Sequence, residues 1–285
     1  MSTHTYRIIF DCPDRVGIVT KVGDFIAQHG GWISDAHHHS DQHSGRFYSR
    51  VVVNADSLKF GLDQLRKKFS ALASELTMNW RIVDSNTPKK VILMASKGSH
   101  CLSDIFDRLK YREFNCEVAA VISNHDSMRG LTEFYGYEYH HVPIDKNDKQ
   151  AGFNEVEKII DQHQADTIVL ARYMQVIPAA LCEKYKHQII NIHHSFLPSF
   201  IGAKPYHQAH ARGVKLIGAT CHYVTSDLDE GPIIEQGVQR VSHSHQIEDL
   251  VRLGRDVEKT VLAKGLRAHL DDRVMVLGNS TIVFG

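Results

Sequence analysis

Apolar positions in the first 84 residues repeat with the spacings of a small α/β domain. Tyr6–Phe10 is rich in residues that favour strands, and Val19, Val22 and Ile26 recur at helical spacing. Gly30–Gly31 follows, where a left-handed cap is needed to end the helix. The remaining pattern predicts a hairpin, a second helix and a last strand, at residues 33–39 and 47–53, about 57–74, and 76–84. The order βαββαβ predicts a ferredoxin-like fold, with two helices covering a four-stranded antiparallel sheet.

A polar, proline-containing stretch separates this segment from a longer one with a different pattern. Residues 85–90 are predicted to be a linker, which divides the chain into domains at 1–84 and 91–285. Beyond it, short apolar strands alternate with helical stretches. Strands are expected at VILMAS, CEVAAVIS, YEYHHV, TIVLAR and QIINIHH, and helices near 101–113, 126–135, 152–163 and 178–186. Such alternation predicts an α/β domain with a Rossmann-like, mostly parallel sheet flanked by helices on both faces.

The balance of charge argues against two classes of partner. Thirty-three basic residues equal thirty-three acidic ones, which offers nothing to attract nucleic acid or a membrane surface. No apolar run approaches the roughly 20 residues of a membrane span, and the first residues lack the apolar stretch of a signal peptide. Five scattered cysteines without a CxxC pair are typical of reduced thiols. We therefore expect a soluble, cytoplasmic protein that binds neither nucleic acid nor membranes.

Histidine is the compositional exception, with twenty residues, several of them in runs. Adjacent histidines on a strand point to opposite faces and cannot readily share one ion. We expect no metal site, and place most of these side chains on surfaces or in ordinary hydrogen bonds.

Polar side chains cluster where a buried strand should end. In IINIHHSFLPSF, residues 189–200, Asn191 and His193 lie two apart at the carboxyl end of a predicted parallel strand, so they face the same way, whereas His194 faces the other. Ligands of open parallel sheets bind beyond this end of the strands. The stretch at 195–213 is rich in Pro and Gly and is expected to be a pocket-shaping loop. A second strand, 217–224, then runs into an acidic turn at 227–230.

An amide, an imidazole and a carboxylate around one cleft suit a reaction at a carbonyl group. The Asn191 amide can donate to a developing oxyanion, and the His193 imidazole can polarise the carbonyl or protonate a leaving amine. The Asp229 carboxylate can orient the imidazole and hold or deprotonate a water, and we expect partial burial to raise its pKa. Spacing alone leaves the alternative open that these residues cap helices and turns.

These motifs resemble the folate-dependent formyltransferase family. NIHHSFLP followed by DLDEGPII matches its catalytic pattern, so the resemblance implies that Asn191, His193 and Asp229 are catalytic. ARYMQVIP, residues 171–178, matches the loop that lines the folate pocket, and the acidic turn matches the backbone that recognises the pterin ring. Folate contacts are therefore implied at Met174, Gln175, Val176, Ile177, Ser226, Asp227 and Leu228. These matches cover about residues 89–285.

Other polar residues near these motifs have either a supporting or a structural role. We expect His194, His222 and His100 to lie close to the reacting residues and support them. Arg172 either pairs with a glutamate tail of folate or forms a structural ion pair. The same residues could equally well satisfy ordinary backbone groups.

Over nearly its whole length, the chain resembles formyltetrahydrofolate deformylases. A glycinamide ribonucleotide transferase needs a Gly-rich phosphate loop, and SKGSHCLSDIF, residues 96–106, retains a single glycine. The resemblance implies hydrolysis of 10-formyltetrahydrofolate to tetrahydrofolate and formate, which balances folate pools and supplies formate for purine synthesis. Folate is then the substrate, and neither a cofactor nor a metal is expected. The alternatives are formyl transfer to a small amine acceptor and a folate-binding sensor without activity.

The N-terminal segment resembles an ACT domain, a regulatory module, through DRVGIVTKV at residues 14–22. The resemblance implies an amino-acid effector near Gly17, where close backbone approach and free helix amides are available. Because such modules tend to pair between subunits, we expect a homo-oligomer, a dimer or a tetramer.

Overall fold

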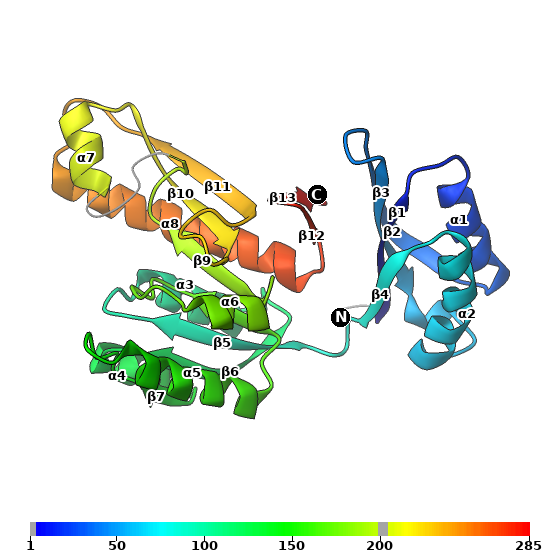
Figure 1. Ribbon diagram of the computed structural model, residues 1–285, viewed down its shortest axis with the longest axis horizontal. Helices are drawn as coiled ribbons and strands as arrows, with labels where there is room; N and C mark the ends of the chain where they lie inside the picture. Colours follow the sequence, from blue (N-terminus) through cyan, green and yellow to red (C-terminus); the bar gives the residue numbers. More distant parts are fainter. Residues whose placement is uncertain (1–3, 199–204) are drawn as a thin grey trace. The chain divides into compact units, whose positions relative to one another are not determined.

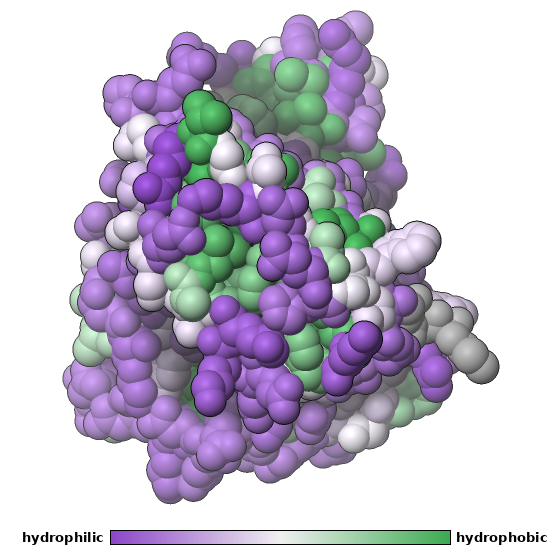
Figure 2. All heavy atoms as spheres, turned by 90° about the vertical axis from the view of Figure 1, so that its right-hand side faces the viewer, coloured by the Kyte–Doolittle hydropathy of each residue, from purple (hydrophilic) through white to green (hydrophobic). Residues whose placement is uncertain are grey.

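The chain folds as two compact units. The computed structural model describes residues 4–198 and 205–285. One unit contains the described residues up to Pro88 together with Ile282–Gly285, and the other contains Lys89–Thr281 (Figure 1). Among the described residues, no helix is long and apolar enough to cross a membrane. The face drawn in Figure 2 is mainly hydrophilic, with separate apolar patches.

The N-terminal unit has the predicted βαββαβ order. Its elements are β1 (Thr5–Pro13), α1 (Ile18–Gln28), β2 (Trp32–Asp41), β3 (Arg46–Asn54), the 3₁₀ turn η1 (Ala55–Ser57), α2 (Leu62–Glu75) and β4 (Asn79–Asp84). The antiparallel sheet has the order β2-β3-β1-β4, which confirms the ferredoxin-like prediction. Gly30 takes a φ of 76° just after α1, as the predicted left-handed cap requires.

The buried face of α1 differs from the predicted one by one position. Ile18, Val22 and Ile26 are buried, whereas Val19 is half exposed. A spacing of four residues aligns the three buried side chains along one side of the helix, so they reach the sheet together with Phe10.

The second unit is built on a seven-stranded sheet of order β11-β10-β9-β8-β5-β6-β7. Neighbouring strands from β7 to β9 pair parallel, whereas β9–β10 and β10–β11 pair antiparallel. The strands are β5 (Lys89–Ala95), β6 (Cys116–Ser123), β7 (Tyr139–His141), β8 (Thr167–Leu170), β9 (Ile189–His193), β10 (Leu216–Tyr223) and β11 (Ile233–Arg240). This sheet confirms the expected mostly parallel α/β fold.

Helices cover both faces of this sheet (Figure 1). They are α3 (His100–Lys110), the 3₁₀ turn η2 (Asp126–Met128), α4 (Arg129–Phe134), α5 (Lys149–His163), α6 (Ala179–Lys184), α7 (Pro205–Arg212) and α8 (Ile247–Leu270). One apolar core lies between the sheet and α3 with α8, and a second between the sheet and α5 with α6. A short hairpin, β12 (Val274–Leu277) and β13 (Ser280–Val283), ends the chain.

Three predicted boundaries are corrected by the structure. Lys89 and Lys90, assigned to the linker, belong to β5, because their backbone pairs with Cys116 and Glu117 of β6. The Lys89 ammonium also binds the buried Asp272 carboxylate at 2.9 Å. The last four residues, assigned to the catalytic domain, group with the N-terminal unit, where Phe284 is buried 6.0 Å from the His37 ring. Part of the predicted loop 195–213 is the helix α7, and its residues 199–204 lie outside the described residues.

Candidate active site

A cavity of about 440 Å³ opens beside the carboxyl ends of β8 and β9. It brings together nearly all the side chains that the sequence singled out. These are Asn191, His193 and Asp229, the predicted folate contacts Met174, Gln175, Val176, Ile177, Ser226, Asp227 and Leu228, and the supporting His194 and His222. His100 does not line this cavity; it lines a neighbouring one. The motifs at 171–178, 191–194 and 226–229 therefore share one site.

The loop after β10 turns back so that its carboxylate reaches the end of β9. Asp229 Oδ1 lies 3.2 Å from Nδ1 of His193, and the two side chains are 13% and 7% exposed. Asp229 takes a φ of 58°, a left-handed conformation that Asp adopts more readily than most residues. Gly231 allows the turn, since a Cβ there would lie 1.8 Å from the Tyr223 carbonyl oxygen.

The hydrogen bond to Asp229 determines which nitrogen of His193 remains for a ligand. Nδ1–H donates to the carboxylate, and Nε2 is buried without a hydrogen-bond partner among the described residues. A buried polar atom without a partner is uncommon and marks a place where a ligand or water is expected. His193 therefore presents Nε2 as a proton acceptor or donor in a cavity that it lines.

Asn191 is oriented by a neighbouring histidine on the antiparallel partner strand. His222 Nδ1 donates to the Tyr223 carbonyl at 2.9 Å, and burial lowers the pKa of His222, so the ring is neutral. Nε2 of the neutral ring is then an acceptor for the Asn191 amide, whose nitrogen lies 3.2 Å away. One amide hydrogen of Asn191 is held in this way, and the other is available to a ligand in the cavity that Asn191 lines.

The expected raised pKa of Asp229 is wrong. Burial by itself raises it, but the hydrogen bond from His193 and the electrostatic influence of the neighbouring His193 and His222 rings outweigh burial, so the pKa of Asp229 is below its ordinary value. Asp229 is therefore ionised at neutral pH and is a weak base. This favours a role in orienting and stabilising His193 over direct removal of a proton from water.

The loop after β8 is held by hydrogen bonds that leave its apolar side chains exposed. The Met174 amide donates to the Ser96 hydroxyl at 2.9 Å, and the Ser96 amide donates to the Arg172 carbonyl at 3.2 Å. Met174 and Val176 are more than half exposed beside the cavity, and so is Leu228 across it. Exposed apolar side chains around a cavity are suited to stacking against a flat ring system.

A buried carboxylate beside the site was missed by the sequence analysis. Glu258 of α8 is 1% exposed. One of its oxygens lies 2.8 Å from His100 Nε2 and 3.3 Å from Arg172 Nε, and the other accepts from the Tyr206 hydroxyl at 2.6 Å. This confirms the structural ion pair expected as one alternative for Arg172. Glu258 follows Gly254 by four residues on the buried side of α8. This helical spacing was the signal in the sequence that could have predicted a buried carboxylate.

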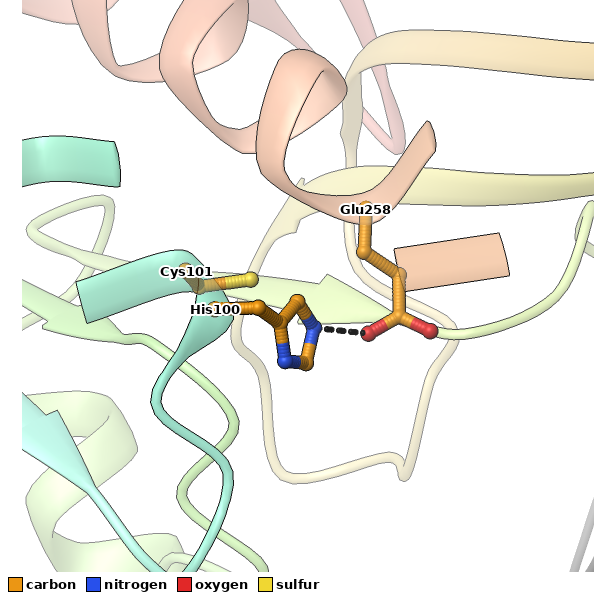
Figure 3. Close-up of side chains that lie close together, drawn as sticks. All are labelled: His100, Cys101 and Glu258. Carbon is orange, nitrogen blue, oxygen red and sulfur yellow. Dashed lines mark hydrogen bonds and ion pairs between the residues drawn. The ribbon is translucent and has the colours of Figure 1, made fainter. Parts of the chain in front are cut away.

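Two groups among the described residues have the geometry to hold a metal ion. One is His100, Cys101 and Glu258, whose first and last side chains point toward each other in Figure 3; the other is Glu138, His140 and His163. In the first group, both Glu258 oxygens already accept hydrogen bonds. Burial by itself raises the pKa of Glu258, but the hydrogen bond from His100 and the charge of Arg172 outweigh it and lower this pKa. A cation there would compete with Arg172 for the carboxylate.

Comparisons with known proteins identify the family of the chain. Residues 89–266 match the family model described as formyl transferase. A formyltetrahydrofolate deformylase from Synechocystis sp. is 43% identical over 100% of both chains. The crystal structure of a formyltetrahydrofolate deformylase from Pseudomonas syringae pv. tomato is 58% identical, covers 100% of this chain and 96% of its own, and has a TM-score of 0.98. A glycinamide ribonucleotide transformylase from Symbiobacterium toebii is 25% identical and covers 70% of this chain and 95% of its own, with a TM-score of 0.65.

Proposed function

Since this chain belongs to the formyltetrahydrofolate deformylase family, we propose that it hydrolyses 10-formyltetrahydrofolate to tetrahydrofolate and formate. The observation that carries the proposal is the His193–Asp229 pair, with its unpartnered Nε2 in a cavity large enough for a pterin ring. Water is the acceptor, and the Asn191 amide is the donor for the oxyanion. The apolar side chains at the cavity mouth bind the folate.

The chemistry runs through His193. A water positioned at Nε2 attacks the formyl carbon while Nε2 takes its proton, and the carbonyl oxygen becomes an oxyanion that accepts from the free Asn191 amide hydrogen. Asp229 stabilises the imidazolium that forms. The imidazolium then returns the proton to N10, the carbon–nitrogen bond breaks, and formic acid leaves and ionises. Asp229, with its lowered pKa, remains a carboxylate throughout.

Transfer to an amine acceptor has less support. The transformylase from Symbiobacterium toebii matches 70% of this chain, whereas the deformylase relatives match all of it. In the stretch that a phosphate loop would occupy, His100 and Cys101 start α3, and Cys101 is buried. The Cys101 thiol is buried and the His100 imidazole is bound to Glu258, so neither side chain is available to hold a phosphate.

The direct test is to mix the purified protein with 10-formyltetrahydrofolate alone and measure tetrahydrofolate and formate together. We expect equal amounts of both without any acceptor, and no turnover from His193→Ala. His243→Ala, which changes an exposed histidine outside the cavity, is the matched control and should keep the wild-type rate. Product that forms only after an amine is added would refute hydrolysis.

We also propose that the N-terminal unit regulates this activity as an ACT domain. The support is its ferredoxin-like fold and Gly17, which has a φ of 92° at the start of α1, where backbone amides are free for an amino-acid carboxylate. We further propose a cytoplasmic homo-oligomer that needs no metal and supplies formate for purine synthesis. Titration of amino acids against the rate, light scattering and metal analysis of the active enzyme test these points separately.

A further inference from the structure

A second cavity, of about 540 Å³, lies beside the proposed catalytic one. Both cavities are lined by Arg172, Met174 and His194, so these three side chains form the wall that they share. The second cavity extends from this wall to α3 and α8. Its other lining residues include Lys97, His100, Arg255 and Glu258. No step of the proposed reaction uses this space.

The two cavities carry opposite charge. Among the described residues, three cationic side chains, Lys97, Arg172 and Arg255, line the second cavity against one carboxylate, Glu258. The catalytic cavity has two carboxylates, Asp227 and Asp229, against the shared Arg172. The carboxylates of the catalytic cavity therefore repel an anion that forms beside Asp229, and the cationic side chains of the second cavity attract it across the shared wall. Clefts lined by one sign of charge concentrate the electrostatic field that acts on small charged ligands.

The single carboxylate in the second cavity is already neutralised. Glu258 accepts from His100 at 2.8 Å (Figure 3). It also pairs with Arg172 at 3.3 Å and accepts from the Tyr206 hydroxyl at 2.6 Å. Tyr206 reaches it because Gly254 leaves space on α8, where a Cβ would lie 2.0 Å from the hydroxyl oxygen. This rigid group holds the shared Arg172 in place between the cavities.

The cations nearer the solvent have no such partners. Lys97 and Arg255 are exposed, and within 4–198 and 205–285 neither forms an ion pair. Cationic side chains at a cavity mouth without compensating carboxylates are suited to attract a small anion from the interior and release it to water, because the attraction is weakened by solvent.

We propose that the second cavity is a binding and exit site for formate, separate from the path taken by the folate. This rests on the proposed function, because hydrolysis creates a small carboxylate deep in the catalytic cavity while tetrahydrofolate still fills the mouth. Formate passes His194 and Arg172 and is held by Lys97 and Arg255 before it leaves.

The test compares two double variants that remove the same charge. Lys97→Gln/Arg255→Gln changes the cavity, and Lys110→Gln/Lys264→Gln changes exposed lysines of α3 and α8 that do not line it. At constant ionic strength, we expect the inhibition constant for formate to rise at least about fivefold in the first variant only. The inhibition constant for tetrahydrofolate and kcat should stay within about twofold in both.

Direct measurement of formate binding tests the cavity site independently of whether the enzyme hydrolyses 10-formyltetrahydrofolate. Titration of ¹³C-formate into each protein, followed by line broadening of its resonance, needs no turnover. Equal formate binding by the two double variants refutes the cavity site, and so does tighter competition by inorganic phosphate, which would mark a phosphate site. Wild-type enzyme that binds formate here but never produces it would refute the exit role together with hydrolysis. Formate production with equal inhibition in both variants would refute the cavity proposal alone.

Discussion

Replacement of Asp229 by Asn tests the central pair of the site. Asn has almost the same shape, and it tolerates the left-handed backbone at this position, where φ is 58°. The change removes the negative charge that lies 3.2 Å from His193 Nδ1 while leaving an oxygen able to accept its hydrogen bond. The variant should therefore fold and bind folate normally.

The size of the effect follows from this distance. Two unit charges 3.2 Å apart attract by about 5 kcal/mol at an effective dielectric constant of about 20. The carboxylate is 13% exposed, and screening by water reduces this attraction to about 4 kcal/mol in our estimate. Because His193 becomes an imidazolium only during the reaction, the loss falls on the transition state. We expect kcat to fall about 1000-fold.

The assay measures kcat from the initial rate of tetrahydrofolate release, and binding from the quenching of protein fluorescence by tetrahydrofolate. Glu230→Gln is the matched control, because it removes the exposed carboxylate of the next residue and should leave kcat unchanged. A variant Asp229→Asn that keeps more than a tenth of the wild-type kcat would show that this carboxylate does not act through His193.

Three further predictions concern the supports of the site. Burial and the charge of Arg172 lower the pKa of His194 from 6.5 to about 4, so the unfolded chain binds more protons and stability falls as the pH drops through this window. Between pH 7 and pH 5 the loss of stability should be about 2 kcal/mol smaller in His194→Gln than in the unchanged protein, as measured by urea unfolding; equal losses in both proteins would contradict it. Gly254→Ala should destabilise the protein by about 2 kcal/mol, because its Cβ would displace Tyr206, whereas Gly130→Ala, which meets no atom within 4 Å, should be neutral or stabilising in thermal melts. Thr220→Val removes three hydrogen bonds of a fully buried hydroxyl and should lower the free energy of unfolding by about 2 kcal/mol in urea titrations; a change below about 0.5 kcal/mol would mean that water replaces them.

Local patterns along the chain were sufficient to predict most of the framework. Strand and helix periodicities depend on neighbouring residues, so the βαββαβ order and the alternation after Pro88 could be derived from spacing. The same holds for Asn191 and His193, because two positions on a strand must face one way. The helix α8 was missed, since the antiparallel strands before it break the alternation from which the other helices were predicted.

Properties of the site that depend on residues far apart in the chain, such as pKa values and ion pairs, could not be predicted from local spacing. Asp229 lies in the loop after β10, and its pKa is lowered by His193 of β9 and His222 of β10, which reverses the effect expected from burial. Glu258 and Arg172 are 86 residues apart in the chain, and only the folded structure shows that the Glu258 carboxylate is buried and paired with Arg172. Sequence alone therefore determined which side chains end the strands, because periodicity is local. The tertiary structure decided their charges and partners, because electrostatic interactions act through space.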